Sequence, residues 1–436
     1  MSSPWADLVA AADPSLVLPV RPRGAAVEVA GPLALVDLVD LGGGHGVGVV
    51  QAGDGNRWTV PLVREADGVR RALPGDGTAE RLVALLTIDP SELGGPYRVT
   101  TWHHEEVQGE RGVTVDQTNE SIVVGERAVV KWSLHLPADG VPGSPAPQRL
   151  AALAAAGFQE TPQPWGTLER VVDGVATLLA AVVEFLPGAQ DGWDWMVDDV
   201  RTFARGDLVL DDALAPPKRL GMLTARMHAA LAATGRGQAT PAQAESWAAR
   251  ARSDLAEAAA LVTGEEGDRL RARAARIGAE LDVLATAAGT PLIDVHGDHH
   301  VGQVLRYGDP AHYAVTDFDG NPVLSPAERL ERQPAAVDVA GMLASLDHVG
   351  RVVLFRTEGV DADAVRLWID QAQHAFLHDY RDTLARMRAA DLLDEALLLP
   401  LRLHQEVREY LYAVRHLPHW VYVPDLALAD LIPTEE

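Results

Sequence analysis

The chain has 436 residues, of which 47% are hydrophobic, and it carries a formal net charge of -25 with no cysteine. At about 100 to 200 residues per domain, this length predicts two or three globular domains. The acidic balance argues against a nucleic-acid groove and against adhesion to anionic membranes, because both need basic faces. The lack of cysteine excludes disulfides and thiolate metal ligands, as is typical of a reducing compartment.

The first residues, MSSPWADLVAAADPSLVLPV, lack the basic and the sustained apolar regions of a signal peptide. No apolar run approaches the ~20 residues of a membrane span. We therefore expect a cytoplasmic protein that binds neither nucleic acid nor membrane.

The first part of the chain has the pattern of β-structure. Residues 33–63 contain apolar runs around the turn 54–56, which predicts a hairpin meander. Further on, two β-branched runs flank Gly125-Glu126 and predict adjacent strands. Of the 37 basic residues only Lys131 and Lys218 are lysines, and Lys131 lies in the second of these strands.

The pattern then becomes helical. A helix is expected from Gln148 to Ala156, with strands following up to residue 187. Charged amphipathic helices are expected over residues 241–287, and a last helix over residues 400–416. A helical apolar period starts near residue 220, with one face formed by Leu220, Leu223, Met227 and Leu231. A β-rich lobe followed by a helical lobe is the order of kinase-like folds, in which ATP lies between the lobes.

Two polar stretches, HGDHHVGQVLR at residues 296–306 and TDFDG at residues 316–320, carry the chemistry. Phosphoryl transfer to a hydroxyl needs a carboxylate at that hydroxyl, oxygen ligands for Mg2+ and a cation at the phosphates. Asp298 is the expected base, and Gln303 and Asp317 are the expected magnesium ligands. Lys131 is the expected cation.

Other interpretations of these residues stay open. His296, His299 and His300 suggest zinc, but three histidines within one tight turn cannot all face one ion. The turn is also compatible with an ordinary loop around a buried histidine. Asp116 to Ser121 could cradle phosphates through backbone N–H groups and hydroxyls, or form a plain hairpin loop, since it has no glycine.

Together these stretches resemble the maltokinase-like, aminoglycoside-phosphotransferase-like kinases and, within them, the actinobacterial glucosamine kinases. The resemblance covers most of the chain, through QTNESIVVGERAVVKW, VVEFLPGAQDGW, HGDHHVGQVLR, TDFDG, DVAGMLASLDH and YLYAVRHLPHW. VHGDHHVGQVL with TDFDG is specific to this branch, because Gln303 replaces the usual magnesium-ligand asparagine.

The resemblance implies an α+β chain with a bilobal, eukaryotic-protein-kinase-like fold and an N-terminal β-rich cap. The expected domains are the cap at 1–90, a nucleotide-binding N-lobe at 91–186 and a helical, catalytic and sugar-binding C-lobe at 187–436. Glu184 to Leu186 would form the hinge whose backbone binds adenine, with Ser121 and Lys131 as further ATP-binding residues.

Two positions depart from the family pattern. Gln148 stands where many members carry a glutamate that pairs with the strand lysine. Asp319, in DFDG, stands where maltokinases usually have glutamate, and it is the third expected magnesium ligand.

The acceptor is expected to lie against the last helix and the segment Pro418-His419-Trp420, which offer hydrogen bonds and an aromatic face. A protonated amino sugar would gain from a carboxylate through charge-assisted hydrogen bonds, whereas neutral maltose would not. The candidate sugar-binding residues are Asp298, His300, Glu406, Glu409, Tyr412 and Trp420. Asp338, by contrast, is expected to be an N-cap or a brace for the catalytic loop.

The sequence thus predicts an ATP- and Mg2+-dependent sugar kinase that converts glucosamine to glucosamine 6-phosphate. The alternatives are a maltokinase that produces maltose 1-phosphate, an aminoglycoside-type phosphotransferase, and a protein that binds nucleotide or sugar without turnover. The sequence leaves the oligomeric state undetermined.

Overall fold

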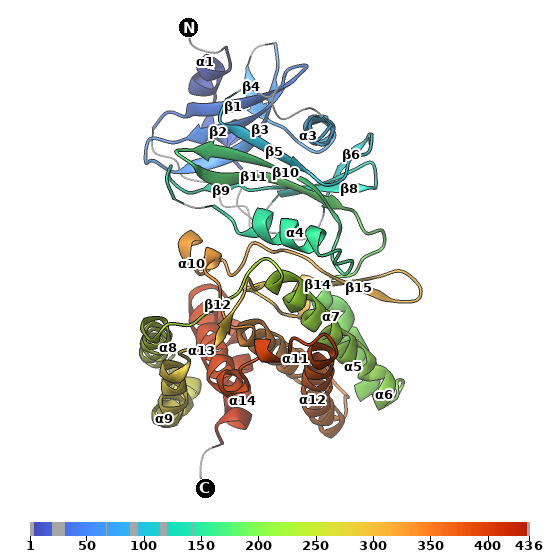
Figure 1. Cartoon of the computed structure of the whole chain (residues 1–436), viewed down its shortest axis with the longest axis vertical. Helices are drawn as coiled ribbons and strands as arrows, with labels where there is room; N and C mark the ends of the chain where they lie inside the picture. Colours follow the sequence, from blue (N-terminus) through green and yellow to red (C-terminus); the bar gives the residue numbers. More distant parts are fainter. Residues whose placement is uncertain are drawn as a thin grey trace. The chain divides into compact units, whose positions relative to one another are not determined.

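The computed structural model describes residues 4–19, 31–66, 68–87, 95–113, 120–141 and 143–433. The chain mixes helices and sheets (Figure 1), which agrees with the expected combination of the two. It forms two compact units: unit 1 is Met1–Ala154, Pro162–Pro187 and Pro322–Leu330, and unit 2 is Ala155–Thr161, Gly188–Asn321 and Glu331–Glu436. Within the described ranges, no helix combines the length and the apolar character that a membrane crossing requires.

Unit 1 begins with an antiparallel sheet in the order β1-β2-β3-β4, with β9 added beside β3. The turn at residues 54–56 joins β2 to β3, so the predicted meander is confirmed. Trp5, Val50 and Trp58 belong to the core between this sheet and the first helices. The elements are α1 (Pro4–Ala11), α2 (Pro14–Val17), β1 (Ala34–Gly42), β2 (His45–Gln51), β3 (Arg57–Arg64), β4 (Val69–Arg71) and β9 (His135–Leu136).

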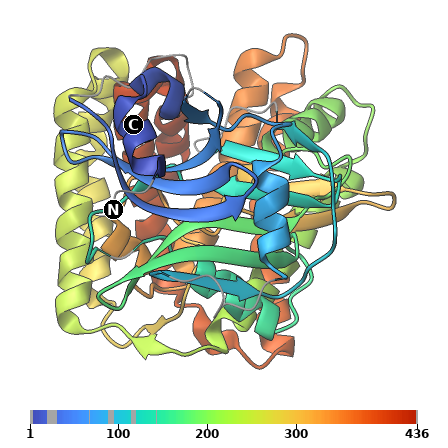
Figure 2. The same cartoon turned by 90° about the horizontal axis from the view of Figure 1, so that it is seen from above.

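The second sheet of unit 1 has six antiparallel strands in the order β5-β10-β11-β8-β7-β6. Its two longest strands, β10 and β11, are green in Figure 2. The predicted turn Gly125-Glu126 joins β7 to β8. The strands are β5 (Tyr97–Thr101), β6 (Glu110–Gly112), β7 (Glu120–Val124), β8 (Ala128–Trp132), β10 (Pro164–Val172) and β11 (Val175–Glu184).

The two faces of this second sheet differ in character. Val130, Leu168 and Ala180 belong to a buried core shared with the first sheet and with α3 (Thr78–Leu85). Side chains alternate between faces along a strand, so Lys131 and Thr167 lie on the other face. The helix predicted from Gln148 to Ala156 is observed as α4 (Ala146–Ala155), and α10 (Pro326–Leu330) completes the unit.

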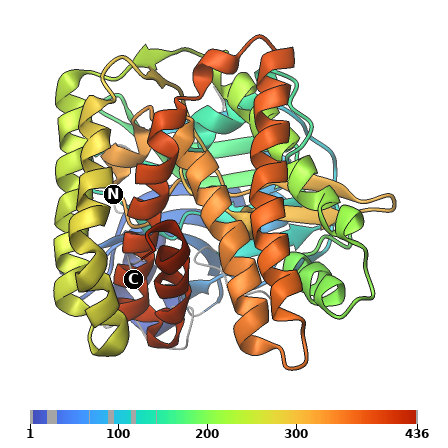
Figure 3. The same ribbon diagram turned by 90° about the horizontal axis from the view of Figure 1, so that it is seen from below.

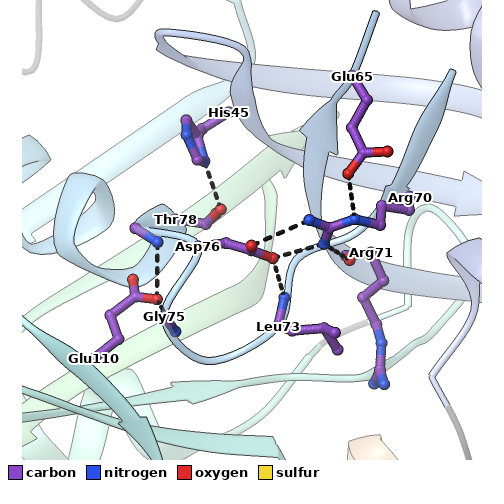
Figure 4. A network of polar contacts seen from close by, with 10 residues as sticks. His45, Glu65, Arg70, Arg71, Leu73, Gly75, Asp76, Thr78 and Glu110 are labelled. Carbon is purple, nitrogen blue, oxygen red and sulfur yellow. Dashed lines mark hydrogen bonds and ion pairs between the residues drawn. The ribbon is translucent and has the colours of Figure 1, made fainter. Parts of the chain in front are cut away.

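A polar network holds the loop that leads into α3 (Figure 4). The Glu110 carboxylate accepts hydrogen bonds from the backbone N–H groups of Gly75, Gly77 and Glu80, each at 2.9 Å. Arg70 pairs with Asp76 at 2.6 Å within the same loop. The first N–H groups of a helix have no partner inside it and favour a negative charge. A carboxylate from the second sheet therefore caps α3.

Unit 2 is mainly helical, and Figure 3 shows its long helices. The predicted apolar face from Leu220 to Leu231 is buried on α7, which packs along α12. The predicted amphipathic pair is observed as α8 and α9. The helices are α5 (Gly192–Ala204), α6 (Leu210–Ala213), α7 (Ala215–Ala232), α8 (Pro241–Leu261), α9 (Gly264–Leu281), α11 (Ala336–Arg356), α12 (Ala362–Arg386), α13 (Leu398–His416) and α14 (Tyr422–Leu431).

Two short pairs of strands complete unit 2. One is a two-stranded sheet that pairs β12 (Gly237–Gln238) with β13 (Pro291–Leu292), on either side of α8 and α9, and the second is a true hairpin of β14 (Val304–Tyr307) and β15 (His312–Val315). This hairpin joins the two polar stretches at 296–306 and 316–320. The hairpin therefore brings the start of the second stretch back beside the end of the first.

Candidate functional site

One transverse row of the second sheet carries two of the expected nucleotide-binding residues. Lys131 on β8 stands in register with Ser121 on β7 and with Ala181 on β11. Directly opposed residues of antiparallel strands point to the same face, so Lys131 and Ser121 share the face opposite to the buried core. Residues 116–119 of the predicted phosphate loop lie outside the described residues.

The expected adenine-binding segment follows β11 directly. The Glu184 N–H donates to the Gln163 carbonyl at 2.8 Å, and the Phe185 N–H donates to the Arg127 carbonyl at 2.8 Å. The Leu186 side chain is buried. The segment is thus fixed by backbone contacts within unit 1, and its role toward adenine stays a prediction.

In unit 2, the turn at residues 296–298 is held by a carboxylate from α11. Asp338 accepts hydrogen bonds from the N–H groups of His296, at 2.7 Å, and Gly297, at 2.8 Å. Gly297 has a φ of 79°, which a residue without Cβ adopts without strain. Asp338 thus acts as the brace that the sequence suggested, while Ala335 holds the N-cap position of α11.

Asp338 also contacts residues in the core of unit 2. Asp338 Oδ2 lies 3.0 Å from His228 Nε2, and His228 Nδ1 lies 2.8 Å from the Tyr380 hydroxyl. Burial by itself would raise the pKa of Asp338, but the hydrogen bond and the charge of His228 outweigh it and lower that pKa well below its usual range. Asp338 therefore stays ionised and keeps accepting both backbone hydrogen bonds.

Asp298, the expected base, is the last residue of the turn at residues 296–298. Its side chain is 22% exposed, and His300 Nε2 lies 4.0 Å from its Oδ2. Its other oxygen, Oδ1, accepts a hydrogen bond from Asn321 Nδ2 at 3.0 Å. One oxygen is thus held by an amide while the carboxylate remains within reach of solvent. This is the arrangement that a base acting on a bound hydroxyl requires.

The three histidines of the turn have separate partners. His296 Nε2 lies 2.9 Å from the Thr316 carbonyl, and His299 Nε2 lies 2.9 Å from the Thr224 hydroxyl. Burial lowers the pKa of His299 well below its usual range, so the ring is neutral. Among the described residues, no group of three or more histidine, aspartate or glutamate side chains is arranged to hold a metal ion.

Two of the expected magnesium ligands, Gln303 and Asp317, flank the β14-β15 hairpin. The Thr316 N–H donates to the Gln303 carbonyl at 2.9 Å, which places Gln303 beside the strand end that leads into Asp317. Asp317 has a φ of 64°, an uncommon conformation for a residue other than glycine. With Asp319, the segment supplies two carboxylates and an amide oxygen, a donor set that fits Mg2+ with nucleotide phosphates and water as its other ligands.

The expected sugar-binding residues of the C-terminal region separate into two groups. Trp420 Nε1 donates to Glu409 Oε2 at 3.2 Å, so these two lie together as expected. Tyr412 is exposed and its ring lies 5.3 Å from that of His416. Glu406, the other candidate glutamate, is 0% exposed.

Glu406 is buried because it has an internal partner. Its Oε2 lies 2.9 Å from His348 Nε2, and the two side chains form a buried ion pair. Burial by itself would lower the pKa of His348, but the Glu406 carboxylate outweighs it and raises that pKa to about 9. The His348 ring lies 6.3 Å from Trp420, so the pair supports the site from behind.

Sequence reasoning missed three residues of this site. Trp193 packs edge to face on Trp420 at 6.1 Å, and a Cβ on Gly302 would meet its indole at 2.8 Å. Trp193 therefore connects the loop after Asp298 with the C-terminal aromatic group. Asn321 directly follows TDFDG, which is a usable signal. Arg408 is partly buried; desolvation lowers its pKa, and the charge of Asp298 is the first of the carboxylate charges that oppose this fall.

Comparison with known proteins identifies close relatives of this chain. No family model matches it. The glucosamine kinase of Streptacidiphilus jiangxiensis is 61% identical over 438 residues, covering 99% of this chain and 99% of that protein. The glucosamine kinase of Mycolicibacterium smegmatis is 43% identical over 403 residues, covering 91% of this chain and 98% of that protein.

Solved structures agree. A glucosamine kinase in complex with glucosamine, ADP and inorganic phosphate is 59% identical, covers 99% of this chain and 100% of that one, and has a TM-score of 0.87. A glucosamine kinase in crystal form B is 58% identical with the same coverage and a TM-score of 0.90. The resemblance seen in the motifs is confirmed, and the chain belongs to the glucosamine kinase family.

Proposed function

We propose that this chain transfers the γ-phosphoryl group of ATP to glucosamine and releases ADP and glucosamine 6-phosphate. The proposal rests on one observation, which is the similarity of this chain to a glucosamine kinase over its full length. A glucosamine kinase in complex with glucosamine, ADP and inorganic phosphate shares 59% identity across 99% of this chain. The motifs independently predict a sugar kinase that binds ATP and glucosamine.

In this proposal Asp298 orients the acceptor hydroxyl and takes its proton as the new bond to phosphorus forms. Asn321 holds one carboxylate oxygen and leaves the other toward the substrate. Asp338 contributes indirectly, because it fixes the two N–H groups that precede Asp298. A base held in this way needs little reorganisation when substrate binds.

Nucleotide binding is assigned to residues of unit 1. Lys131 would approach the phosphates from the sheet face that it shares with Ser121. A compact ammonium on a flexible stem suits this task better than the broad fork of arginine, the other cation that this chain uses. The backbone from Glu184 to Leu186 would bind adenine, which follows from the resemblance.

Magnesium is assigned to Gln303, Asp317 and Asp319 of unit 2. When bound, the ion would neutralise the charge on the nucleotide phosphates. The left-handed backbone at Asp317 supports this role, since strained conformations of this kind cluster at functional sites.

Glucosamine differs from neutral sugars by its amino group, which is protonated at neutral pH. Glu409 is a partly buried carboxylate that its neighbour Trp420 already orients, so we assign it to the ammonium. The indole of Trp420 would pack on the sugar ring, with His300 and Tyr412 at the margins. Glu406 would act through His348 rather than touch the sugar, since both of its oxygens are within hydrogen-bond distance of that ring.

The division into a cap at 1–90, an N-lobe at 91–186 and a C-lobe at 187–436 is part of the proposal, as is the bilobal protein-kinase-like fold. The cytoplasmic location also stays a prediction.

The first experiment measures initial rates of ADP formation with ATP and Mg2+. The acceptors are glucosamine, N-acetylglucosamine, glucose, maltose and an aminoglycoside. We expect glucosamine to give the highest kcat/KM. A preference for maltose would assign the chain to the maltokinase activity instead, and the absence of ADP formation with every acceptor would contradict the kinase proposal.

The second experiment tests the base. Asp298→Asn keeps the shape and the contact with Asn321, but removes the proton acceptor. We expect kcat with glucosamine to fall by about 10² to 10⁴, with an unchanged unfolding curve. Asp207→Asn, a substitution in an exposed loop of the same unit, serves as the matched control. Near-normal turnover of a folded Asp298→Asn protein would refute the assignment.

A further inference from the structure

A cavity of about 410 Å³ lies within unit 1, on the sheet face that carries Lys131. Strands β5 and β10 form its floor and α4 forms one wall. Its volume lies in the range of pockets that hold small ligands, roughly 300 to 1,000 Å³. All of its lining residues belong to unit 1, and none of them is a residue to which the proposed phosphoryl transfer assigns a role.

The floor of the cavity contains a buried hydroxyl with no partner. Thr167 on β10 is 0% exposed, and its Oγ1 makes no hydrogen bond. Thr167 stands in register with Thr100 on β5, which also lines the cavity, so the two side chains share this face. Buried polar groups in native proteins nearly always have a partner. A polar ligand in the cavity would supply one.

The charges of the cavity cancel. Glu169 on β10 and Arg98 on β5 are register partners, and the guanidinium donates to both carboxylate oxygens at 3.0 Å. An anion such as phosphate would meet the Glu169 carboxylate and compete with it for Arg98. An ammonium would meet Arg98. The closed pair therefore favours an uncharged ligand.

The remaining lining groups suit a ligand that is rich in hydroxyls. Thr100, Thr167 and Ser144 carry hydroxyls, and Gln148 carries an amide, so each can donate and accept. Trp102 adds an aromatic surface of the kind that packs on the C–H groups of sugar rings. Hydroxyl groups of a carbohydrate likewise donate and accept, which makes them complementary to this set.

We infer that this cavity is a second ligand site that binds an uncharged carbohydrate of one or two rings, distinct from the sugar that the turn at Asp298 acts on. Thr167 donates to or accepts from a ligand hydroxyl, and the Arg98–Glu169 pair bonds to others without being opened. The site lies against α4 and in the transverse row of Lys131, two strands away from it. The inference does not depend on glucosamine being the acceptor.

The test is titration calorimetry of the full chain with maltose and with glucose as probes. Saturating glucosamine and ADP are present, so that the proposed catalytic site is occupied. Ala151→Leu fills the cavity from α4, and Thr167→Val removes the unpaired hydroxyl while keeping the branched shape. Ala155→Leu makes the same change at an exposed position of α4 outside the cavity, and serves as the matched control.

We expect at least one of the two sugars to bind saturably to the wild type. Ala151→Leu and Thr167→Val should each weaken that binding at least tenfold, while Ala155→Leu leaves it unchanged and all three retain the wild-type kcat for glucosamine. If one variant does not fold, the other decides. Absence of saturable binding to the wild type would overturn the inference. So would equal binding by the folded cavity variants and the control, or inorganic phosphate binding more tightly than either sugar.

Discussion

Two turns of this protein are each held by a carboxylate from a distant element, and the proposed function assigns chemistry to only one of them. In unit 1 the Glu110 carboxylate accepts hydrogen bonds from three backbone N–H groups around the start of α3, and Figure 4 labels one of the donors, Gly75. In unit 2 the Asp338 carboxylate accepts two N–H groups of the turn before Asp298. Both carboxylates come from elements distant in sequence from the turn that they hold.

The difference between the two turns is burial. Glu110 is partly exposed, so water can replace it, whereas Asp338 is 1% exposed and pairs with His228, whose other ring nitrogen contacts the Tyr380 hydroxyl. An exposed cap contributes stability to one helix end. A buried brace fixes the direction in which the next side chain points, because no solvent can substitute for it.

The largest expected effect comes from removing the buried brace. Asp338→Ala leaves two buried N–H groups and His228 without their acceptor, so we expect the free energy of unfolding to fall by about 3 to 5 kcal/mol. We also expect kcat to fall at least a hundredfold, because Asp298 loses its orientation. Urea unfolding and ADP formation measure the two effects.

Asp338→Asn provides the second arm of this experiment, since it keeps one acceptor oxygen and the side-chain volume. Its stability should lie between those of the wild type and Asp338→Ala. A folded Asp338→Ala protein with wild-type kcat would show that the turn needs no brace.

A third carboxylate, the buried Glu406, gives a pH-dependent effect of intermediate size. Glu406 raises the pKa of His348 from 6.5 to about 9, so the contribution of the protonated pair is complete below pH 6.5 and is lost as the pH rises through 9. We expect the free energy of unfolding to fall by roughly 1 to 3 kcal/mol over that interval.

Urea unfolding of the wild type and of His348→Gln at pH 6, 7.5 and 9 measures this effect. The variant should be less stable at pH 6 and should approach the wild type at pH 9. A difference that stays constant across the three pH values would contradict the raised pKa.

The smallest expected effect is at the exposed cap. Glu110→Ala removes the acceptor of three N–H groups that water can reach, so we expect a loss of about 1 to 2 kcal/mol, as for other helix caps. The kcat for glucosamine should not change. Glu126→Ala, which breaks an exposed ion pair with Arg111 on the same sheet, is the control and should cost less than about 1 kcal/mol. A larger loss of unfolding free energy for Glu126→Ala than for Glu110→Ala would show that the cap stabilises the protein no more than a surface ion pair does.

The local pattern of the sequence was enough for the strands and turns near Gly55 and Gly125, the apolar face of α7 and the α8-α9 pair. Alternation along strands and the helical period are local properties, and they do not depend on partners far away in the chain.

The local pattern did not reveal that Glu406 is buried, because the residue that makes its burial tolerable, His348, lies on another helix. Trp193 was missed for a similar reason, since its partners Gly302 and Trp420 are distant in sequence.

The sequence by itself determined which chemical groups are present and their order: a lone strand lysine, a histidine-glycine-aspartate turn, and two aspartates one hairpin later. Only the tertiary structure decided which carboxylate braces a turn, which one pairs with a buried histidine and which one stays partly exposed. The physical reason is that a carboxylate takes its role from burial and hydrogen-bond partners, and both come from elements brought together by folding.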